Sequence, residues 1–328
     1  MKEGSPVAVK QNTTPAAALE LTDRQKKRKD RIKLIKQNYQ LYFFLIPAVV
    51  FIALFMYGPL YGLVIAFKNY RPGDGIWGSR WVGFDWFVRF FSTPKCWDVI
   101  RNTLTVSIYS LIAGFPFPIC LAIILNYVKN LRFKKFAQTV TYMPYFISTV
   151  VLVAMMNLFF SPTSGFVNTI IKSFGGEPVY FMGISNLFPH MYVWSGIWQG
   201  MGYSSIIYIA ALSGVSPELH ESAVIDGANI LQRIWNIDIP TIMPTMVILL
   251  IMSCGSIMNV GYEKVLLMQN DLVIDSAEVI STYVYKQGLV NQQYSYSTAV
   301  GLMNNVINFI VLVAANKLSN KIFGSGLW

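Results

Sequence analysis

Charged residues are unevenly distributed along the chain, which leaves six long stretches without Asp, Glu, Lys or Arg. These stretches are residues 37–67, 102–128, 136–171, 178–217, 239–262 and 287–316. Each holds a run of roughly 20 mostly apolar residues, enough for a helix rising about 1.5 Å per residue to cross a hydrocarbon core of about 30 Å. The pattern predicts an all-α polytopic membrane protein with six transmembrane helices, near residues 41–67, 103–128, 136–160, 187–212, 241–262 and 295–316.

Composition supports this prediction. Only 13% of the 328 residues are charged, whereas soluble domains carry about 25%. The formal net charge of +10 is better explained by membrane topology than by nucleic-acid binding, because the lysines and arginines lie beside apolar stretches.

The first apolar run has a basic segment before it. Residues 41–67 form 27 apolar or uncharged residues, far longer than the core of about 7–15 residues in a cleaved signal peptide. Eight lysines or arginines lie between Arg24 and Lys36. We therefore expect residues 1–36 to form a basic cytoplasmic tail and residues 37–325 to form the transmembrane domain.

The positive charges also predict orientation. Seventeen of the 26 lysines and arginines lie in the tail 1–36, the loop 128–135, the loop after the fourth span and the C-terminal end. Six of the other nine lie in the loop 68–101, and long loops weigh less in this rule. Both termini and residues 216–240 are predicted to be cytoplasmic, and residues 68–101 are predicted to be external.

The sequence lacks the motifs of several common metal-binding, nucleotide-binding and hydrolytic sites. Cys96, Cys120 and Cys254 form no CxxC pair, and His190 and His220 are too few for a histidine-rich metal site. The sequence has no GxxxxGK[ST], so this chain cannot hold ATP phosphates in a P-loop, and it has no GxSxG or HExxH. The predicted spans carry no Asp, Glu, Lys or Arg in their interior, which disfavours proton- or sodium-driven transport. No catalytic, cofactor-binding or metal-binding residue is predicted.

Neutral polar residues do enter the predicted spans. Hydrogen bonding between helices explains many such residues, but as a set they also suit a neutral, hydroxyl-rich ligand, because aromatic rings stack on sugars and amides bond to hydroxyls. The predicted substrate path comprises Tyr142, Tyr145, Asn157, Trp194, Trp198, Gln199, Asn259, Asn304 and Asn308. Tyr203, Tyr262 and Asn305 are polar neighbours within the same spans.

The predicted cytoplasmic loop 216–240 reads as two short helices. Ser216 is a suitable N-cap, with Pro217 at the first helical position and Glu218 next. Gly227 can adopt the left-handed conformation that ends a helix. The second helix is expected over residues 228–238, and Pro240 marks the start of the fifth span.

The spacing within this loop is specific. Glu221-Ser222-Ala223, three residues, Gly227, nine residues and Ile237-Asp238-Ile239-Pro240 resemble the EAA loop of binding-protein-dependent ABC importer permeases. Ser222 replaces the central Ala of that pattern and Ile239 replaces a Leu.

Other stretches are similar to the carbohydrate branch of the same family. They are "YGPLYGLVIAFKNY", "YMPYFISTVVLVAMM", "GYEKVLLMQN" and "YSTAVGLMNNVINFIVLVAANKLSNKI". The resemblance covers residues 38–325 and is closest to permeases for aldouronates, alginate fragments and related oligosaccharides.

The resemblance implies a type I permease fold and a specific set of partners. These are a second, homologous permease (a heterodimer), a cytoplasmic ABC ATPase dimer that holds ATP and Mg²⁺, an external solute-binding protein and an oligosaccharide. It places the chain in the bacterial cytoplasmic membrane. The residues it assigns to ATPase coupling are Glu221, Ser222, Ala223, Asp226 and Gly227. The binding protein is expected against Trp77–Trp97 and the hairpin near Gly175.

Two alternatives stay open at this point. The same machine could carry another solute, such as a polyamine, phosphate or peptide, although the lack of acids in the spans argues against a polycation in the pore. A non-transport membrane protein is the second alternative, and purification without an ATPase or a second permease would favour it.

Overall fold

The computed structural model describes residue 34 and residues 37–328, so the predicted tail 1–36 lies outside the described residues apart from residue 34. The chain divides into two compact units, residues 1–62 and 63–328. Helices up to the middle of the chain are α2 Tyr39–Phe51, α3 Gly75–Gly78, α4 Asp85–Ser92, α5 Pro94–Gly114, α6 Pro116–Tyr127, α7 Leu131–Tyr142, α8 Thr149–Phe159 and α9 Phe166–Ser173. The later ones are α10 Phe188–Leu212, α11 Pro217–Ile225, α12 Ile230–Arg233, α13 Ile239–Cys254, α14 Tyr262–Met268, α15 Ile274–Ala277, α16 Ile280–Tyr285 and α17 Tyr294–Phe323. Strands β1 Lys68–Asn69 and β2 Arg80–Trp81 pair antiparallel.

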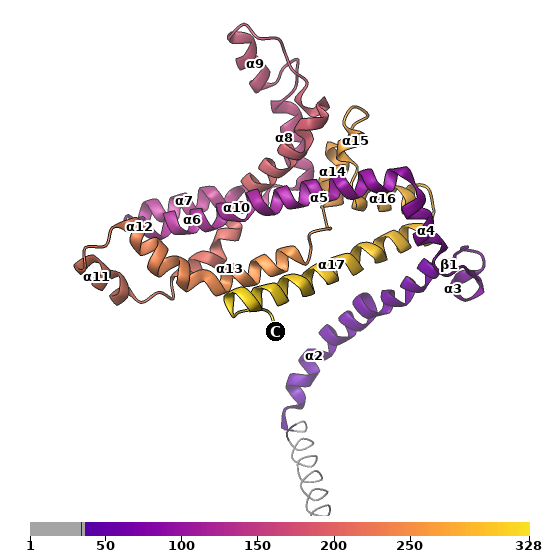
Figure 1. The fold of residues 1–328 in the computed structure, drawn as a ribbon, viewed down its shortest axis with the longest axis horizontal. Helices are drawn as coiled ribbons and strands as arrows, with labels where there is room; N and C mark the ends of the chain where they lie inside the picture. The colour runs from indigo at the N-terminus through magenta and orange to yellow at the C-terminus, as the bar shows by residue number, and fades with distance from the viewer. Residues whose placement is uncertain (1–33, 35–36) are drawn as a thin grey trace, which may run out of the picture. The chain divides into compact units, whose positions relative to one another are not determined.

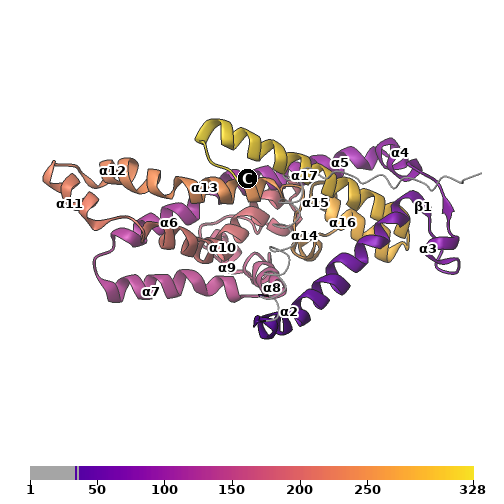
Figure 2. The same cartoon turned by 90° about the horizontal axis from the view of Figure 1, so that it is seen from below.

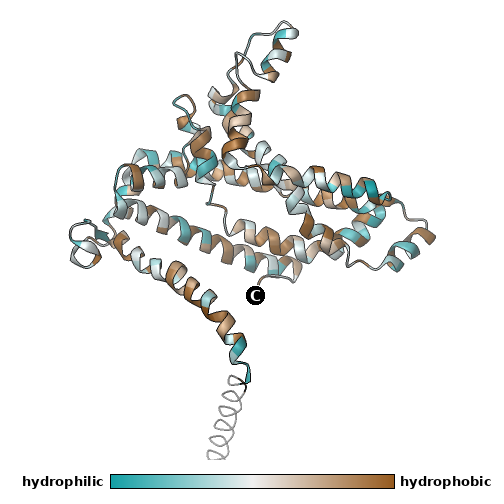
Figure 3. Ribbon diagram, turned by 180° about the vertical axis from the view of Figure 1, so that it is seen from behind, coloured by the Kyte–Doolittle hydropathy of each residue, from teal (hydrophilic) through white to brown (hydrophobic). Residues whose placement is uncertain are grey.

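One apolar helical segment, Tyr39–Phe67, makes up most of the described part of the first unit. α2 continues through a π-helical stretch, Ile52–Tyr57, and a 3-10 stretch, Gly58–Phe67. Every side chain from residue 37 to residue 61 is exposed, and apolar residues cover most of α2 (Figure 3). A water-exposed helix of this composition is unfavourable, so the segment Tyr39–Phe67, with a mean hydropathy of 2.3, requires lipid or a protein partner around it.

The second unit is a helical bundle built around α10. This helix packs against α5, α6, α7 and α13, and α13 also packs against α17 (Figures 1 and 2). The buried apolar residues form three clusters. One lies between α6, α10 and α13, one between α4, α5, α16 and α17, and one between α8, α14, α15 and the start of α10.

Residues 136–160 do not form the single straight span that the sequence predicts. α7 and α8 meet at an angle of 97°, and a 3-10 turn, Met143–Phe146, lies between them. Pro144 lies within that turn and lacks a backbone N–H, and the Ser148 side chain accepts a hydrogen bond from the backbone N–H of Val151, which starts α8 afresh. The break therefore has a local cause in the sequence.

Among the described residues, four helices are long and apolar enough to cross a membrane, or five if the bent pair α7 and α8 counts as one span. They are Tyr39–Phe67, Pro94–Tyr127, Ile230–Cys254 and Tyr294–Phe323. α10 has 25 residues but contains many Gly, Ser, Trp and Tyr residues, which lower its hydropathy. The chain is thus an all-α membrane protein, and the number of six spans stays a prediction.

The fifth predicted span differs at both ends from the observed helix. The sequence predicts residues 241–262, whereas the helix runs from Ile230 to Cys254. It continues through Pro240 because a π-helical turn, Ile234–Asp238, accommodates the missing N–H of the proline. It ends at Cys254, and residues 255–261 are turns and irregular backbone.

The loop 68–101, which the sequence predicts to be external, lies at the opposite end of the bundle from the predicted cytoplasmic loops, whereas the hairpin near Gly175, which follows α9, projects from the side of the bundle (Figure 1). α11 and the start of α7 are at one end, and β1, α3 and α4 are at the other (Figures 1 and 2). The length of the bundle therefore lies between these two groups of elements.

The close approach of α10 to α7 gives a stability prediction. A side chain on Gly202 would clash with the backbone carbonyl of Thr141, whereas the space around Gly200 is open. Gly202→Ala should destabilise the protein by roughly 1–3 kcal/mol through overpacking, measured as a lower melting temperature in detergent. Gly200→Ala is the matched control and should melt at or above the wild-type temperature, because Ala favours helix by about 1 kcal/mol. Equal melting of the two variants would contradict the packing described here.

Candidate functional site

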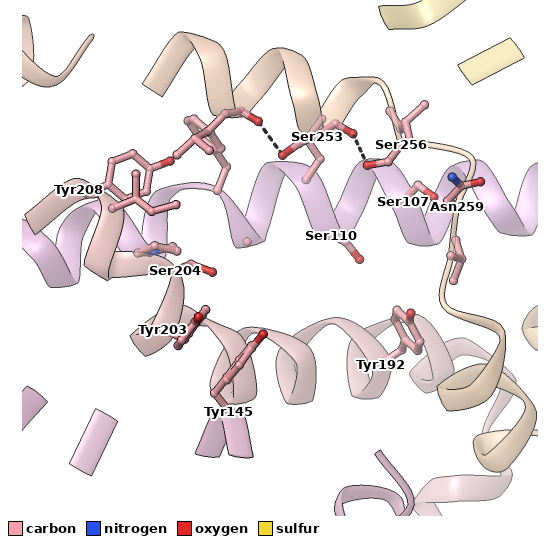
Figure 4. A pocket seen from close by; sticks show the side chains of 18 of the residues that line it. Ser107, Ser110, Tyr145, Tyr192, Tyr203, Ser204, Tyr208, Ser253, Ser256 and Asn259 are labelled. Atoms are coloured by element: carbon pink, nitrogen blue, oxygen red, sulfur yellow. Dashed lines mark hydrogen bonds between the residues drawn. The ribbon is translucent and has the colours of Figure 1, made fainter. Parts of the chain in front are cut away.

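A cavity of about 720 Å³ lies between α5, α10, α13 and the segment that follows α13 (Figure 4). Its polar lining consists almost entirely of hydroxyl groups, and none of its lining residues is charged. The polar residues are Ser107, Ser110, Tyr145, Tyr192, Tyr203, Ser204, Tyr208, Ser253, Ser256 and Asn259. Such a surface suits a ligand that carries hydroxyl groups and weakly apolar ring faces.

Ser253, near the end of α13, and Ser256, in the turn that follows, both have their hydroxyl protons bound to nearby carbonyls. Ser253 Oγ donates to the Leu249 carbonyl at 2.8 Å and Ser256 Oγ donates to the Ser253 carbonyl at 3.2 Å (Figure 4). Their protons are bound to these carbonyls, so their oxygens are left as acceptors. Ser107 and Ser110 are three residues apart on α5 and share a face. A ligand hydroxyl therefore finds acceptors on two helices.

Two tyrosines form an aromatic wall. The rings of Tyr145 and Tyr203 stack with centroids 3.9 Å apart and planes 5° apart. Tyr145 belongs to the 3-10 turn Met143–Phe146, and Tyr203 belongs to α10. The break between α7 and α8 thus brings an aromatic ring from the third predicted span against the fourth.

The structure places the predicted substrate residues in different surroundings. Tyr145 and Asn259 line the cavity. Gln199 instead donates to the Ile147 carbonyl at 2.7 Å and joins α10 to the break before α8. Four other predicted residues also do not line this cavity: Tyr142, Asn157, Trp194 and Trp198.

The other two predicted residues, Asn304 and Asn308, belong to a cluster with Asn259. Asn259 Oδ1 accepts from Asn304 Nδ2 at 2.9 Å and from Asn308 Nδ2 at 3.0 Å. Asn308 Oδ1 accepts from the backbone N–H of Met258 at 2.9 Å. The cluster fixes the turn after α13 to α17, so these amides serve as bonds between helices, while Asn259 also reaches the cavity.

Sequence reasoning missed the serines and one lysine. The pairs Ser107/Ser110 and Ser253/Ser256, each spaced three apart in an apolar run, are a signal that could have identified the lining. Lys264 in α14 is 9% exposed, and its ammonium lies 2.9 Å from the Tyr192 carbonyl and 4.6 Å from the centroid of the Tyr192 ring.

The ammonium of Lys264 has no carboxylate within 4 Å in the described part of the chain. Burial lowers the pKa of Lys264 to about 8, because the charged form loses its hydration. A buried cation next to a cavity-lining residue is a functional candidate that a count of charges in the spans does not reveal.

The predicted coupling loop has its first helix and its turn where the sequence predicts them, but the second helix is not a separate short helix, because it begins at Ile230 and continues into α13. α11 begins with Pro217 after Ser216, although the Ser216 side chain makes no capping hydrogen bond. Gly227 has φ +81°, the left-handed conformation. Asn229 then caps α12 in a reciprocal capping box with Gln232, a signal that the sequence analysis overlooked.

The predicted coupling residues lie on an accessible surface. Glu221, Ser222, Asp226 and Gly227 are exposed, and Ala223 is half-buried. α11 contains no buried residue. The loop therefore projects from the end of the bundle as a short helix that another protein can contact.

Comparison with known proteins explains this architecture. Residues 114–324 match the family described as "Binding-protein-dependent transport system inner membrane component". The chain belongs to this family. The permease is 39% identical to the polygalacturonan/rhamnogalacturonan transport system permease protein YteP of Bacillus subtilis (strain 168), over 96% of this chain and 98% of the relative. It is 40% identical to Protein LplB of the same organism, over 90% of this chain and 92% of the relative.

A solved structure has the same fold. The permease aligns with a chain of a bacterial alginate ABC transporter, crystallised in complex with an alginate pentasaccharide-bound periplasmic protein, with a TM-score of 0.83 and 38% identity. The alignment covers 90% of this chain and 99% of that chain. The chain is a type I ABC permease, a transporter subunit rather than an enzyme.

The asparagine cluster gives a second stability prediction. Asn259→Ala removes the acceptor of two amides and should destabilise the permease by roughly 1–3 kcal/mol, because buried donors lose their partner. A lower melting temperature in detergent measures the loss. Asn305→Ala is the control, since Asn305 is exposed and lies next to Asn304 in the same helix. Unchanged melting of Asn259→Ala would show that the cluster does not hold the turn.

Proposed function

We propose that this permease is the membrane-spanning subunit of an ATP-driven importer that translocates an anionic oligosaccharide. The observation that carries the proposal is the cavity of about 720 Å³ lined by hydroxyls and tyrosine rings. Sugar rings present apolar faces to aromatic side chains and hydroxyls to serines, whereas phosphate and a peptide backbone have no apolar ring face to stack on the tyrosines. The fit favours the oligosaccharide over the other solutes considered from the sequence.

The anionic class is supported by Lys264 and by the relatives. The Lys264 ammonium lies behind Tyr192, which lines the cavity, and its field in a low-dielectric wall attracts carboxylates. Two similar proteins are described as a polygalacturonan/rhamnogalacturonan permease and as part of an importer of the acidic polysaccharide alginate. These polymers contain uronate residues, and a buried cation in the path would offset their charge.

The permease works with partners at both ends of the bundle. A cavity formed by one subunit is completed by a second, homologous permease, and an ABC ATPase dimer with ATP and Mg²⁺ engages α11. An external solute-binding protein docks on the end that carries α4 and on α9. Exposed aromatics support this docking: Trp81 is 61% exposed, and Phe174, at the end of α9, is 87% exposed.

In this proposal the protein lies in the bacterial cytoplasmic membrane with both termini in the cytoplasm. ATP binding closes the ATPase dimer and moves α11, and the permease pair changes between inward-facing and outward-facing states as a rigid-body switch. A second candidate function, that of a non-transport scaffold, has no feature of the site in its favour.

Substitution of Gly227 tests the import function. The residue has φ +81°, which proline cannot adopt. In proteoliposomes that contain the partner permease, the ATPase and a loaded binding protein, Gly227→Pro should lower ATP-driven oligosaccharide uptake at least about tenfold. Glu221→Ala should lower it in the same direction.

Gly227→Asn is the matched control, because asparagine tolerates the left-handed conformation, and it should retain most uptake. Normal uptake by Gly227→Pro, or a permease that purifies without any ATPase or second permease, would overturn the import function. Uptake of a phosphate, peptide or polyamine in place of the oligosaccharide would overturn the proposed substrate class.

Substitution of Lys264 tests the anionic class. Lys264→Gln should lower uptake of a uronate oligosaccharide about tenfold while leaving uptake of its methyl-esterified, uncharged form unchanged. Since the pKa of Lys264 is about 8, wild-type uptake of the anionic form should be highest below pH 8 and should fall as pH rises through that value.

Lys317→Gln, which removes an exposed charge at the end of α17, is the control and should resemble the wild type. Equal losses for the anionic and esterified substrates would show that Lys264 has a structural role instead.

A further inference from the structure

The side chain of Asp238 is completely buried at the point where three helical elements meet. It belongs to the π-helical turn Ile234–Asp238, which joins α12 to α13. Its Oδ2 accepts a hydrogen bond of 2.7 Å from the hydroxyl of Tyr127, the last residue of α6. Its Oδ1 lies 3.2 Å from Nε2 of His220 in α11. One carboxylate thus contacts groups from α6 and α11 at the start of α13.

His220 supplies the side-chain nitrogen that lies closest to this carboxylate, at 3.2 Å. Within the described residues, no lysine or arginine nitrogen lies within 4 Å of Asp238. The guanidinium of Arg233 instead lies over the Tyr127 ring, 5.5 Å from its centroid. By contrast, the other buried carboxylate of the described chain, that of Glu278, contacts both Lys95 and Lys286. A buried carboxylate with few polar partners depends strongly on each of them.

His220 is also the principal attachment of α11 to the bundle. No residue of α11 is buried, and of its nine residues only His220 and Ala223 are half-buried. The side chain of Ser222 donates a hydrogen bond to the Leu219 carbonyl, which stays within the helix. In the described part of the chain, the His220–Asp238 contact is the one polar side-chain link from α11 to the rest of the protein.

The backbone at Asp238 is shaped for this contact. The N–H of Ile239 donates to the carbonyl of Ile234, five residues back, rather than four. Pro240 follows and has no N–H to continue the α-helical ladder. A π-helical turn shifts the helical phase of the residues in it, and such turns are frequent at functional sites.

We propose that Asp238 is a positioning residue that transmits the movement of α11 to α6 and α13. The proposal rests on the proposed function, in which α11 contacts the ATPase. A displacement of α11 pulls on His220, and the carboxylate passes this displacement to Tyr127 and to the helix that continues into α13. α6 and α13 both pack against α10, which lines the cavity. ATPase closure therefore reaches the cavity wall through side-chain contacts as well as through the backbone.

The test uses the assembled transporter in proteoliposomes and measures oligosaccharide uptake per ATP hydrolysed. His220→Ala should lower this ratio about tenfold, while ATP hydrolysis stays within about twofold of the wild type. His220→Gln retains a donor near the position of Nε2 and should restore most of the ratio. A helix that merely needs a stable attachment would lose its partner ATPase, and so lose hydrolysis and uptake together.

A double-mutant cycle separates this link from independent effects. If His220 and Asp238 act through each other, the variant with both His220→Ala and Asp238→Ala should have about the same ratio as either single variant, rather than the product of the two losses. Thr241→Val is the matched control, since Thr241 is exposed near Asp238 and bonds within its own helix. It should resemble the wild type.

The outcomes also distinguish this inference from the proposed function. A wild-type assembly that neither binds an ATPase nor takes up oligosaccharide overturns the proposed function. A wild-type assembly that transports, together with a His220→Ala variant of unchanged uptake per ATP or with multiplicative losses in the cycle, overturns the role of Asp238 and leaves the proposed function intact.

Discussion

The close packing of α10 against its neighbours is the contact on which the bundle depends. Gly202 leaves room for the backbone of α7, and Gln199 holds the break before α8 through the Ile147 carbonyl. Because α10 also packs against α5, α6 and α13, it carries one wall of the cavity and fixes the position of the others. A larger residue at the point of contact would move Tyr145 away from Tyr203, and the aromatic wall would be lost.

The polar groups inside the bundle are arranged so that the free-energy cost of burying them is offset by hydrogen bonds. A buried hydroxyl or amide is tolerated when a nearby carbonyl or amide satisfies it. Ser253 of α13 and the amide donors of Asn304 and Asn308 are satisfied in this way. Charges are treated differently. Glu278 has two lysines, Asp238 has a histidine and a tyrosine, and Lys264 has a carbonyl and an aromatic ring. The more weakly compensated charges are the ones assigned here to function.

These charges connect the two ends of the molecule. Asp238 lies beside the loop that is proposed to meet the ATPase, while Lys264 lies behind the cavity wall, towards the opposite end of α10. Between them run α10 and α13, whose serines and tyrosines line the cavity. In the proposed function, movement at the loop and charge recognition in the cavity would be linked through these two helices, which would couple hydrolysis to one class of solute.

The sequence by itself determined the membrane class, the family and the turn at Gly227 in the predicted coupling loop. Long uncharged runs have no other stable environment, and a left-handed glycine at residue 227 is a local requirement of the backbone. The tertiary structure decided which polar residues face the cavity and which join helices. From the sequence alone, Asn304, Asn308 and Gln199 could all bind a substrate. In the structure, the orientation of their helices directs these side chains towards other parts of the bundle. The break at Pro144, the π-helical turn before Pro240 and the end of the helix at Cys254 shift the phase and length of each span. A hydropathy profile averages over these residues, so it does not detect such shifts. Asp238 and Lys264 could be identified as functional candidates only once their neighbours from distant parts of the chain were known.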